Sequence, residues 1–456
     1  MKKFFTLLLA VISTMTAFAQ TEPAIELQAE VDGNTRTFSI GLATEGTVQI
    51  DWGNGEKVTS EVIPAFSGNN WVNVSGTVSG DGKVKIYGDN IVYFECSSRV
   101  DGAQVLSLDV TKATTLKDLT AYTNKLASID LTKNTELEKL TIYSNQLTSI
   151  DISKCTKLTT LDITNNLLTT IDITKNQALQ TLKIGQNKLA GELDLSTNPT
   201  IKSVYALTNE LTSVKIGNNT ASKPYFSFNY NKLTSIDASG INDAKNAILF
   251  LIGNQLTEIK LPATQMKSLN ITKNNFTLAT LPAPSVAKFF TYAPQNDYVI
   301  AESYKVGDVL DLSSQTSATL NTQFAVYKSD KTALTEGTDY TVADGKITFL
   351  TAQEAVYVTM SSALYKFTGT SIYKTTVTKV EGSTGINAVT AQGVKVSTAG
   401  NEISISGLSQ GDAVTVTNLG GAVVANFHAN SANAHVQAAK GLYIVSINGK
   451  AIKVAL

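Results

Sequence analysis

Few residues of this sequence are of a type that could perform catalysis or hold a metal. The 456-residue chain has two histidines, His428 and His435, and two cysteines, Cys96 and Cys155. Both histidines lie near the C-terminal end, so a Ser-His-Asp or Cys-His arrangement has no histidine to use elsewhere in the chain. The CxxC, HExxH and phosphate-loop motifs are absent. The sequence therefore predicts no catalytic residue, no metal site and no cofactor.

Carboxylates are abundant, and some of them recur regularly. None of the 38 acidic residues stands in a recognisable active-site motif, although paired-carboxylate catalysis is compatible with the composition. Five aspartates recur once per repeat and should form a column. This column could bind calcium, or it could be a solvated edge on which nearby lysines compensate the aspartates. We favour the compensated edge. The aspartates are Asp109, Asp130, Asp151, Asp172 and Asp194, and the first four are followed three residues later by Lys112, Lys133, Lys154 and Lys175.

A periodic asparagine shows which elements must position these residues. Each asparagine stands in the frame Leu-x-x-Leu-x-Leu-x-x-Asn-x-Leu, and successive asparagines are 20 to 23 residues apart. That pattern predicts a leucine-rich-repeat solenoid over residues 91–290. The solenoid is expected to end soon after the last asparagine, at the proline-containing segment 281–284. The asparagines are Asn124, Asn145, Asn166, Asn187, Asn209, Asn231, Asn254 and Asn274.

Each repeat predicts a short strand followed by a sharp turn. Leu140 and Ile142 should point inward, whereas Thr141 and Tyr143 should point outward from a parallel sheet. The periodic asparagine should satisfy backbone groups at the turn, because its amide both donates and accepts hydrogen bonds. Rungs of about 21 residues leave no room for a long helix on the return side, which should be extended or contain a short 3₁₀ turn.

A second asparagine ladder is expected on the return side. Cys155 occupies the corresponding position in its own rung, where it should face inward as a small apolar residue. Cys96 lies near the strand side of the first rung. Because the two cysteines belong to different rungs and opposite edges, no disulfide is expected between them. The asparagines of this ladder are Asn134, Asn176, Asn198 and Asn219.

The outward strand positions are the candidate binding residues. Exposed apolar groups on a rigid concave sheet are what partner recognition uses. The alternative is that the later members of this set are covered by neighbouring loops or by the next domain. The candidates on the concave face are Tyr122, Tyr143, Tyr205, Leu207, Asn229, Phe250 and Ile252.

The repeats resemble a known bacterial family. The short rungs and the phrase Leu-Thr-Ser-Ile-Asp-Ile-Ser-Lys at residues 147–154 resemble the internalin-J-like repeats of bacterial surface proteins. The resemblance covers roughly residues 91–290. It implies a cell-surface adhesion or colony-building role and names no ligand.

Sandwich-type β modules are predicted on both sides of the solenoid. Residues 20–90 should form a β-sandwich cap, and the segment 48–55 resembles the strand-turn phrase of PKD-like surface domains. Asp51, Asn54 and Glu56 could form a calcium loop there, but we favour a hairpin turn. Residues 295–381 contain short strands separated by turn residues, which predicts an immunoglobulin-like domain. The fold class is therefore mainly β.

The N-terminus has the features of an export signal. Lys2 and Lys3 precede an apolar run, and small residues precede a cleavage site between Ala19 and Gln20. This pattern predicts a secretory signal peptide over residues 1–19. The rest of the chain has no apolar run long enough to span a membrane.

The C-terminal segment resembles an export address. The phrase at residues 441–447, followed by Lys450 and Lys453, and the earlier segment 411–423 resemble the type IX secretion sorting domains of Bacteroidetes. The resemblance covers residues 386–456. It implies that the type IX secretion machinery recognises this tail and that the tail is cleaved near a Gly/Ser/Thr linker. The alternative is an ordinary β-sandwich retained in the mature protein.

The balance of charge does not favour a polyanionic partner. Thirty-seven basic and 38 acidic residues leave a net charge of −1, which gives no attraction to nucleic acid or anionic membrane. We expect a non-enzymatic protein, displayed on the outer cell surface or released, that binds a protein or glycan of a host or neighbouring cell in attachment or biofilm formation. The alternatives are a structural surface-layer component that self-associates and, less favoured, a glycan-active enzyme.

Overall fold

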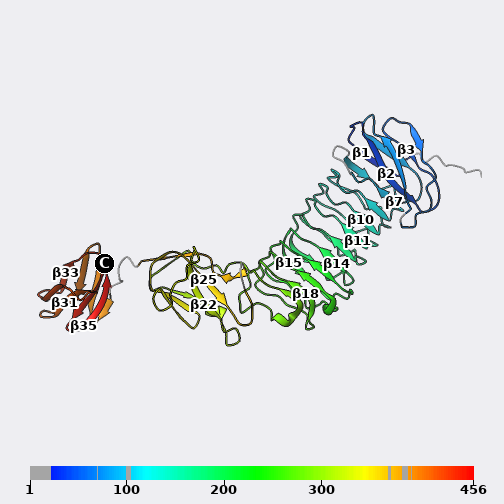
Figure 1. Ribbon diagram of the computed structural model, residues 1–456. Coiled ribbons are helices and arrows are strands. Elements are labelled where there is room, and N and C mark those ends of the chain that lie inside the picture. The colour runs from blue at the N-terminus through cyan, green and yellow to red at the C-terminus, as the bar shows by residue number, and fades with distance from the viewer. Residues whose placement is uncertain (1–21, 69, 99–103, 368–370, 383–388, 392) are drawn as a thin grey trace, which may run out of the picture. The chain divides into compact units, whose positions relative to one another are not determined.

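The computed structural model describes residues 22–68, 70–98, 104–367, 371–382, 389–391 and 393–456 (Figure 1). Two compact units are formed. One contains the chain up to Asn296 together with Phe367–Ile372, and the other contains Asp297–Lys366 and Tyr373–Leu456. The fold is mainly β, as expected. No helix among the described residues is long and apolar enough to cross a membrane. The predicted signal peptide, with its Ala19–Gln20 cleavage site, and residues 383–385 of the predicted linker at 381–385 lie outside the described residues.

The N-terminal module consists of two sheets around an aromatic core. Phe38 stacks on Trp52 with ring centroids 5.3 Å apart and also contacts Phe94. Gly76 lies flat against the Trp52 ring, where an added Cβ would come within 2.2 Å of it. The strands are β1 Ile25–Ala29, β2 Thr35–Leu42, β3 Gln49–Asp51, β4 Lys57–Thr59, β5 Val72–Thr77, β6 Lys83–Tyr87, β7 Ile91–Glu95 and β8 Val105–Asp109, in the sheets β4-β3-β6-β1-β8 and β5-β2-β7.

The module and the solenoid share a sheet, so the boundary expected at residue 90 falls inside a continuous structure. Strand β7 pairs antiparallel with β2 of the module on one side. On its other side β7 pairs parallel with the first full rung, where Phe94 lies opposite Leu119. Strand β8 pairs antiparallel with β1. The first rung is therefore covered by backbone hydrogen bonding, and Figure 1 shows the strands following one another without a break.

The turn at Asp51 is a hairpin turn. One carboxylate oxygen of Asp51, Oδ1, accepts hydrogen bonds from the amides of Gly53 and Gly55, both at 2.9 Å. Asn54 Oδ1 accepts the amide of Glu56 at 3.1 Å. The turn joins β3 to β4, which pair antiparallel. These side-chain oxygens therefore close a tight turn, as the favoured interpretation expected.

The solenoid stacks short parallel strands in strict register. Leu140 lies between Leu119 and Leu161, so the inward leucines form one continuous row. The return side is irregular apart from the parallel pair β13 Ala190–Asp194 and β15 Glu210–Lys215 and the short 3₁₀ turns η1 Ala244–Asn246 and η2 Pro284–Val286. The sheet strands are β9 Asp118–Thr120, β10 Lys139–Thr141, β11 Thr160–Asp162, β12 Thr181–Lys183, β14 Ser203–Tyr205, β16 Tyr225–Ser227, β17 Ile248–Phe250, β18 Met266–Asn270 and β19 Ala287–Thr291.

The asparagine ladder links each rung to the one before it. Asn145 Nδ2 donates to the carbonyls of Ala121 at 2.9 Å and Ile142 at 3.0 Å, and its Oδ1 accepts the amide of Leu126 at 3.0 Å. All eight predicted ladder asparagines are buried. The residue before each adopts positive φ, near 55° for Ser144, which turns the chain so that the amide enters the core. The donating and accepting role expected for these side chains is confirmed.

The solenoid continues one rung beyond the expected end. Strand β19 pairs in parallel with β18, and Gln295, twenty-one residues after Asn274, takes the ladder position. Gln295 is buried, and its Nε2 donates to the carbonyls of Ile271, at 2.9 Å, and Tyr292. Gln295 therefore makes the donor contacts that asparagine makes in earlier rungs, and the start expected for the next domain at 295 is too early.

The return-side ladder also forms, and it includes Cys155. Asn134 Nδ2 donates to the carbonyls of Val110 and Ala113, both at 3.0 Å. Cys155 is buried at the same position, and its Sγ lies 3.7 Å from the carbonyl oxygen of Leu131. Both cysteines are free thiols, as expected. Burial raises the pKa of the Cys155 thiol to about 11 and raises that of Cys96 as well.

The second unit begins with a module of mostly antiparallel strands, in which β20 and β27 pair in parallel. Its inward residues include Val326, Ile347, Phe349 and Val358. Two sheets are present, with the strand orders β20-β27-β25-β22, where β26 pairs with β25, and β21-β24-β23. The elements are β20 Ser303–Lys305, β21 Val309–Asp311, η3 Ser313–Gln315, β22 Gln323–Lys328, β23 Tyr340–Ala343, β24 Lys346–Phe349, β25 Gln353–Ser361, β26 Tyr373–Lys374 and β27 Thr378–Glu381.

The C-terminal segment is a separate β-sandwich with its own core. Val396, Ile405, Val416, Val445 and Val454 are among its fully or almost fully buried residues. The two sheets have the orders β28-β29-β30-β33 and β32-β31-β34-β35. The strands are β28 Val389–Ala391, β29 Val394–Ala399, β30 Glu402–Ser406, β31 Ala413–Asn418, β32 Val423–His428, β33 Asn433–Gln437, β34 Leu442–Ile447 and β35 Lys450–Ala455.

Candidate partner-binding face of the repeat sheet

The outward side chains of the parallel strands form one surface, which we call the sheet face. Registered pairing aligns them in rows: Asp118, Lys139 and Thr160 neighbour one another, as do Thr120, Thr141 and Asp162. Because strands lie about 4.8 Å apart, equivalent side chains on neighbouring rungs can touch. Every rung therefore adds two or three residues to this face at fixed spacing.

Tyr122 and Tyr143 stack face to face on this surface. Their ring centroids are 4.6 Å apart and the ring planes differ by 3°. Both residues are half-buried. Each ring therefore covers one face of the other. Burial raises the pKa of Tyr143, with Tyr122 as the next cause, so its hydroxyl stays protonated at neutral pH.

A second group of aromatic and aliphatic residues covers the sheet face from β14 to β17. We call it the aromatic cluster, and it consists of Tyr205, Leu207, Tyr225, Phe250 and Ile252. The Tyr225 ring lies 5.1 Å from that of Tyr205 and makes an edge contact with Phe250 at 5.7 Å. All five residues are half-buried. The ring contacts thus join two of the predicted candidates, Tyr205 and Phe250, through Tyr225. The predicted Leu207 and Ile252 occupy the next outward position of the same two rungs.

Tyr225, the central residue of this cluster, was not among the predicted candidates. It occupies the first outward position of its strand, opposite Ser203 and Ile248, whereas the prediction counted only the two later outward positions. The same position holds Asp118 and Lys139 in earlier rungs, so the repeat frame contained the signal. Asn229, which was predicted, is half-buried, and its Oδ1 accepts the amide of Ile252 at 2.8 Å. That bond gives Asn229 a structural role between rungs.

The N-terminal end of the sheet face is covered by the module itself. Tyr93 on β7 is buried because Phe66 and Trp71 both stack on it, with centroids 5.2 and 5.1 Å away. Its hydroxyl donates to Glu95 Oε2 at 2.9 Å. The accessible part of the sheet face therefore begins beyond Tyr93.

Charge is confined to the first rungs of the sheet face. Lys139 Nζ lies 3.8 Å from Asp118 Oδ2, and Lys183 Nζ lies 3.2 Å from Asp162 Oδ2. Burial raises the pKa of Asp118, which Lys139 opposes. From β14 to β18 the residues that continue these outward rows are uncharged, and the exposed Lys267 of β18 precedes the rows. The aromatic cluster therefore lies in the uncharged half of the face.

The aspartates of the column close turns, and the lysines three residues on stabilise their charge less than the turn hydrogen bonds do. Asp130 Oδ1 accepts the amide and hydroxyl of Thr132 at 2.9 and 2.7 Å. These hydrogen bonds hold the pKa of Asp130 below its ordinary value, with a smaller contribution from Lys133. The same bond to the amide two residues on is made by Asp109, Asp151, Asp172, Asp194 and Asp237. The ion pairs of this column come from the next rung, as in Lys215–Asp194 at 3.2 Å.

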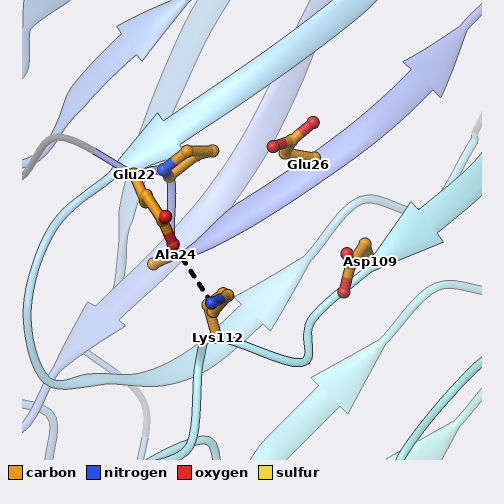
Figure 2. Close-up of a pocket in the computed structure, with 6 residues that line it drawn as sticks. Glu22, Ala24, Glu26, Asp109 and Lys112 are labelled. Atoms are coloured by element: carbon orange, nitrogen blue, oxygen red, sulfur yellow. Dashed lines mark ion pairs between the residues drawn. The ribbon is translucent and has the colours of Figure 1, made fainter.

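The first aspartate of the column lies in a shallow pocket of about 260 Å³ (Figure 2). Figure 2 shows Asp109 near Glu26, which is its neighbour across β1 and β8, and shows Lys112 paired with Glu22. That ion pair measures 3.1 Å between exposed side chains. Within the described ranges, no group of three or more His, Cys, Asp or Glu side chains is arranged to hold a metal ion.

His435 has serine and carboxylate neighbours, but their geometry is not that of a catalytic triad. Ser404 Oγ lies 3.1 Å from His435 Nδ1, and Glu402 Oε1 lies 2.8 Å from the same nitrogen. In a triad the hydroxyl and the carboxylate contact opposite nitrogens of the imidazole ring. One nitrogen then accepts the proton of the hydroxyl, while the carboxylate holds the N–H of the other. The three side chains therefore form a surface cross-strand contact, because Ser404 and His435 are register partners.

Comparison with known families identifies the type of repeat. The family described as Leucine Rich repeats (2 copies) matches residues 135–176. The solenoid is made of leucine-rich repeats. The family described as Domain of unknown function (DUF6383) matches residues 383–456. No curated protein matches the sequence.

Solved leucine-rich-repeat structures resemble parts of the chain. The functional domain of InlJ from Listeria monocytogenes is 19% identical, with a TM-score of 0.41, over 64% of this chain and 67% of that one. A leucine-rich-repeat protein of Leptospira interrogans is 22% identical, with a TM-score of 0.35, over 42% and 53%. YopM, an effector from Yersinia pestis, is 16% identical, with a TM-score of 0.31, over 42% and 57%. The chain thus spans about half to two thirds of these structures.

Proposed function

We propose that this is an exported, non-enzymatic protein whose leucine-rich-repeat sheet binds a protein partner through the aromatic cluster. Leucine-rich repeats generally mediate protein interactions, and solenoids do so over extended surfaces. The observation that carries the proposal is the half-buried, uncharged group around Tyr225, whose ring contacts those of Tyr205 and Phe250 on a rigid sheet. Large aromatic side chains at the centre of a surface supply most of the binding energy in protein interfaces.

A protein partner fits this surface better than a glycan. Sugars stack on open aromatic faces, but Tyr122 and Tyr143 each have one face occupied by the other, and Tyr225 contacts a ring on either side. Leu207 and Ile252 add aliphatic surface that offers a sugar no hydrogen bond. Apolar side chains of a protein partner would gain from burial against all of these groups.

The experiment is a binding screen of the mature chain, residues 20–456, on arrays of purified extracellular-matrix proteins and of glycans. A fragment beginning at 91 is unsuitable, because β7 pairs with β2 of the module. We expect protein hits that are lost in the double variant Tyr205→Ala/Phe250→Ala and kept in Tyr327→Ala, a half-buried tyrosine of the second unit. Hits restricted to glycans, or protein hits that the double variant leaves unchanged, would contradict the proposal.

Attachment or biofilm formation at the outer cell surface is the setting that we propose for this interaction. The signal-peptide pattern at residues 1–19 supports export. The C-terminal sandwich has a core of its own, which supports a role as a removable address for the type IX secretion machinery. In cells, we expect surface-fraction protein whose mass corresponds to loss of residues from about 386 onward. Intact surface protein that still carries the segment would refute cleavage.

A further inference from the structure

A row of lysines lies along one edge of the repeat sheet, where the strands begin. We call it the lysine edge, and it runs beside the second half of the solenoid. Lys202 immediately precedes β14, Lys223 precedes β16 by two residues, and Lys245 lies in η1 before β17. Lys267 and Lys288 are the second residues of β18 and β19. All five side chains are exposed, and each rung from β14 to β19 contributes one.

The same edge is charge-compensated in the first half of the solenoid. Lys117 and Glu138, which immediately precede β9 and β10, form an ion pair of 3.4 Å. Thr159 and Gln180 hold this position in the next two rungs. Along the lysine edge, by contrast, none of the five lysines forms an ion pair with a carboxylate among the residues that the structure describes. The edge therefore carries both charges in the first half of the solenoid and mainly positive charge in the second half.

One carboxylate lies near this edge, and it is engaged locally. Asp243 Oδ2 accepts the backbone amide of Lys223 at 2.9 Å, and Asn246 Nδ2 donates to both of its oxygens at 2.9 and 3.1 Å. These bonds shape the loop before β17. One acid leaves the edge with a clear positive excess.

The lysine edge adjoins the aromatic cluster. The amide of Tyr225 donates to the carbonyl of Lys202 at 2.8 Å, and Tyr225 is the register partner of Ser203. Lys267 immediately precedes Ser268, the partner of Ile248 in the strand that carries Phe250. An uncharged apolar surface is thus bordered on one side by positive charge over four rung spacings, or about 19 Å. An extended segment of about six residues spans that length.

We propose that the partner bound by the aromatic cluster is an acidic protein segment. Its carboxylates would face the lysine edge, and its apolar side chains would contact Tyr225, Phe250 and their neighbours. This inference rests on the proposed function and names the partner class. A polyanion such as sulfated polysaccharide or nucleic acid would satisfy the lysines, but it would leave the aliphatic surface of Leu207 and Ile252 without a matching group. Charge complementarity of this kind sets specificity and the association rate.

Peptide selection on the mature chain tests the proposal directly. A random peptide library displayed on phage is selected on immobilised protein, on the variant Lys202→Glu/Lys245→Glu/Lys267→Glu, and on Lys133→Glu/Lys154→Glu/Lys175→Glu. The control lysines are also exposed and also come one per rung, but they lie on the return side. Heparin and single-stranded DNA serve as competitors. Thermal melts of all three proteins check that the exposed substitutions leave the fold intact.

We expect peptides that combine Asp or Glu with aromatic and aliphatic residues. Reversal of the lysine edge should weaken the selected peptides by about tenfold or more and remove most of their salt dependence, whereas the control should change affinity little. Neutral apolar peptides that depend on the aromatic cluster alone would overturn the inference while leaving the proposed function standing. Peptides that depend on neither surface would overturn both. Heparin or DNA binding through the lysine edge, without any selected peptide, would overturn the inference in favour of a polyanion.

Discussion

Asn166→Ala is expected to lower the free energy of unfolding by about 3 to 4 kcal/mol. Asn166 Oδ1 accepts the buried amide of Leu147 at 3.0 Å, and its Nδ2 donates to the carbonyls of Ile142 and Ile163, both at 3.1 Å. Alanine removes every one of these bonds and leaves the backbone groups in a core that water does not reach. Each orphaned buried group costs about 1 to 3 kcal/mol.

The measurement is chemical denaturation followed by far-ultraviolet circular dichroism. Tryptophan fluorescence is less suitable, because Trp52 and Trp71 both lie in the N-terminal module. Asn242→Ala is the matched control: Asn242 is exposed, and its Nδ2 donates only to Asn218 Oδ1, so a loss of about 0.5 kcal/mol or less is expected. An Asn166→Ala protein as stable as this control would show that water or relaxation of the rung satisfies the ladder groups.

The repeat sequence determined the solenoid well because its signals are local and repeated. The inward leucines, the ladder asparagines and the inward-facing Cys155 each follow from one residue's place in its own rung, and the structure confirms them. The same reasoning missed the last rung, where Gln295 replaces asparagine. An amide one methylene longer reaches the same carbonyls. A search by spacing from Asn274, without regard to residue type, would have found it.

Contacts between distant segments could not be read from the repeat pattern. The pairing of β7 with β2 joins residues about fifty positions apart, and nothing in either strand alone specifies that partner. The covering of Tyr93 by Phe66 and Trp71 depends on the path of a loop outside the repeats. The covering of the N-terminal end of the sheet face therefore could not be read from the repeats alone.

The aspartate column shows a different limit. Spacing correctly identified Asp130 and its equivalents as one column, but it assigned their compensation to the lysine three residues on. In the structure the nearest donor is the amide and hydroxyl two residues on, at Thr132. A backbone amide at a turn is held in place, whereas a lysine side chain loses conformational entropy to reach the same oxygen. Local turn geometry therefore outcompetes the charge pattern.

Within the aromatic cluster, substitution of Tyr225 is expected to weaken binding most. In binding to a protein hit from the screen, Tyr225→Ala should weaken affinity by about 30- to 300-fold, as expected for a central aromatic of an interface. Tyr225 contacts both Tyr205 and Phe250, so its loss removes contact area and also leaves two rings without support. Isothermal titration calorimetry with the mature chain measures the change.

Tyr225→Phe separates the ring from its hydroxyl. The hydroxyl has no hydrogen-bond partner among the described residues and is held neutral by burial, which raises its pKa. If ring area carries the binding, the affinity of Tyr225→Phe should stay within about threefold of that of the parent protein, an effect below 1 kcal/mol.

Tyr230→Ala is the comparison within the same rung. Tyr230 is 52% exposed in the turn after the strand, so its loss should weaken affinity only a few-fold. Equal losses for Tyr230→Ala and Tyr225→Ala would move the centre of the interface to the edge of the sheet. An unchanged affinity in Tyr225→Ala, with an unchanged thermal melt, would remove the aromatic cluster from the binding surface altogether.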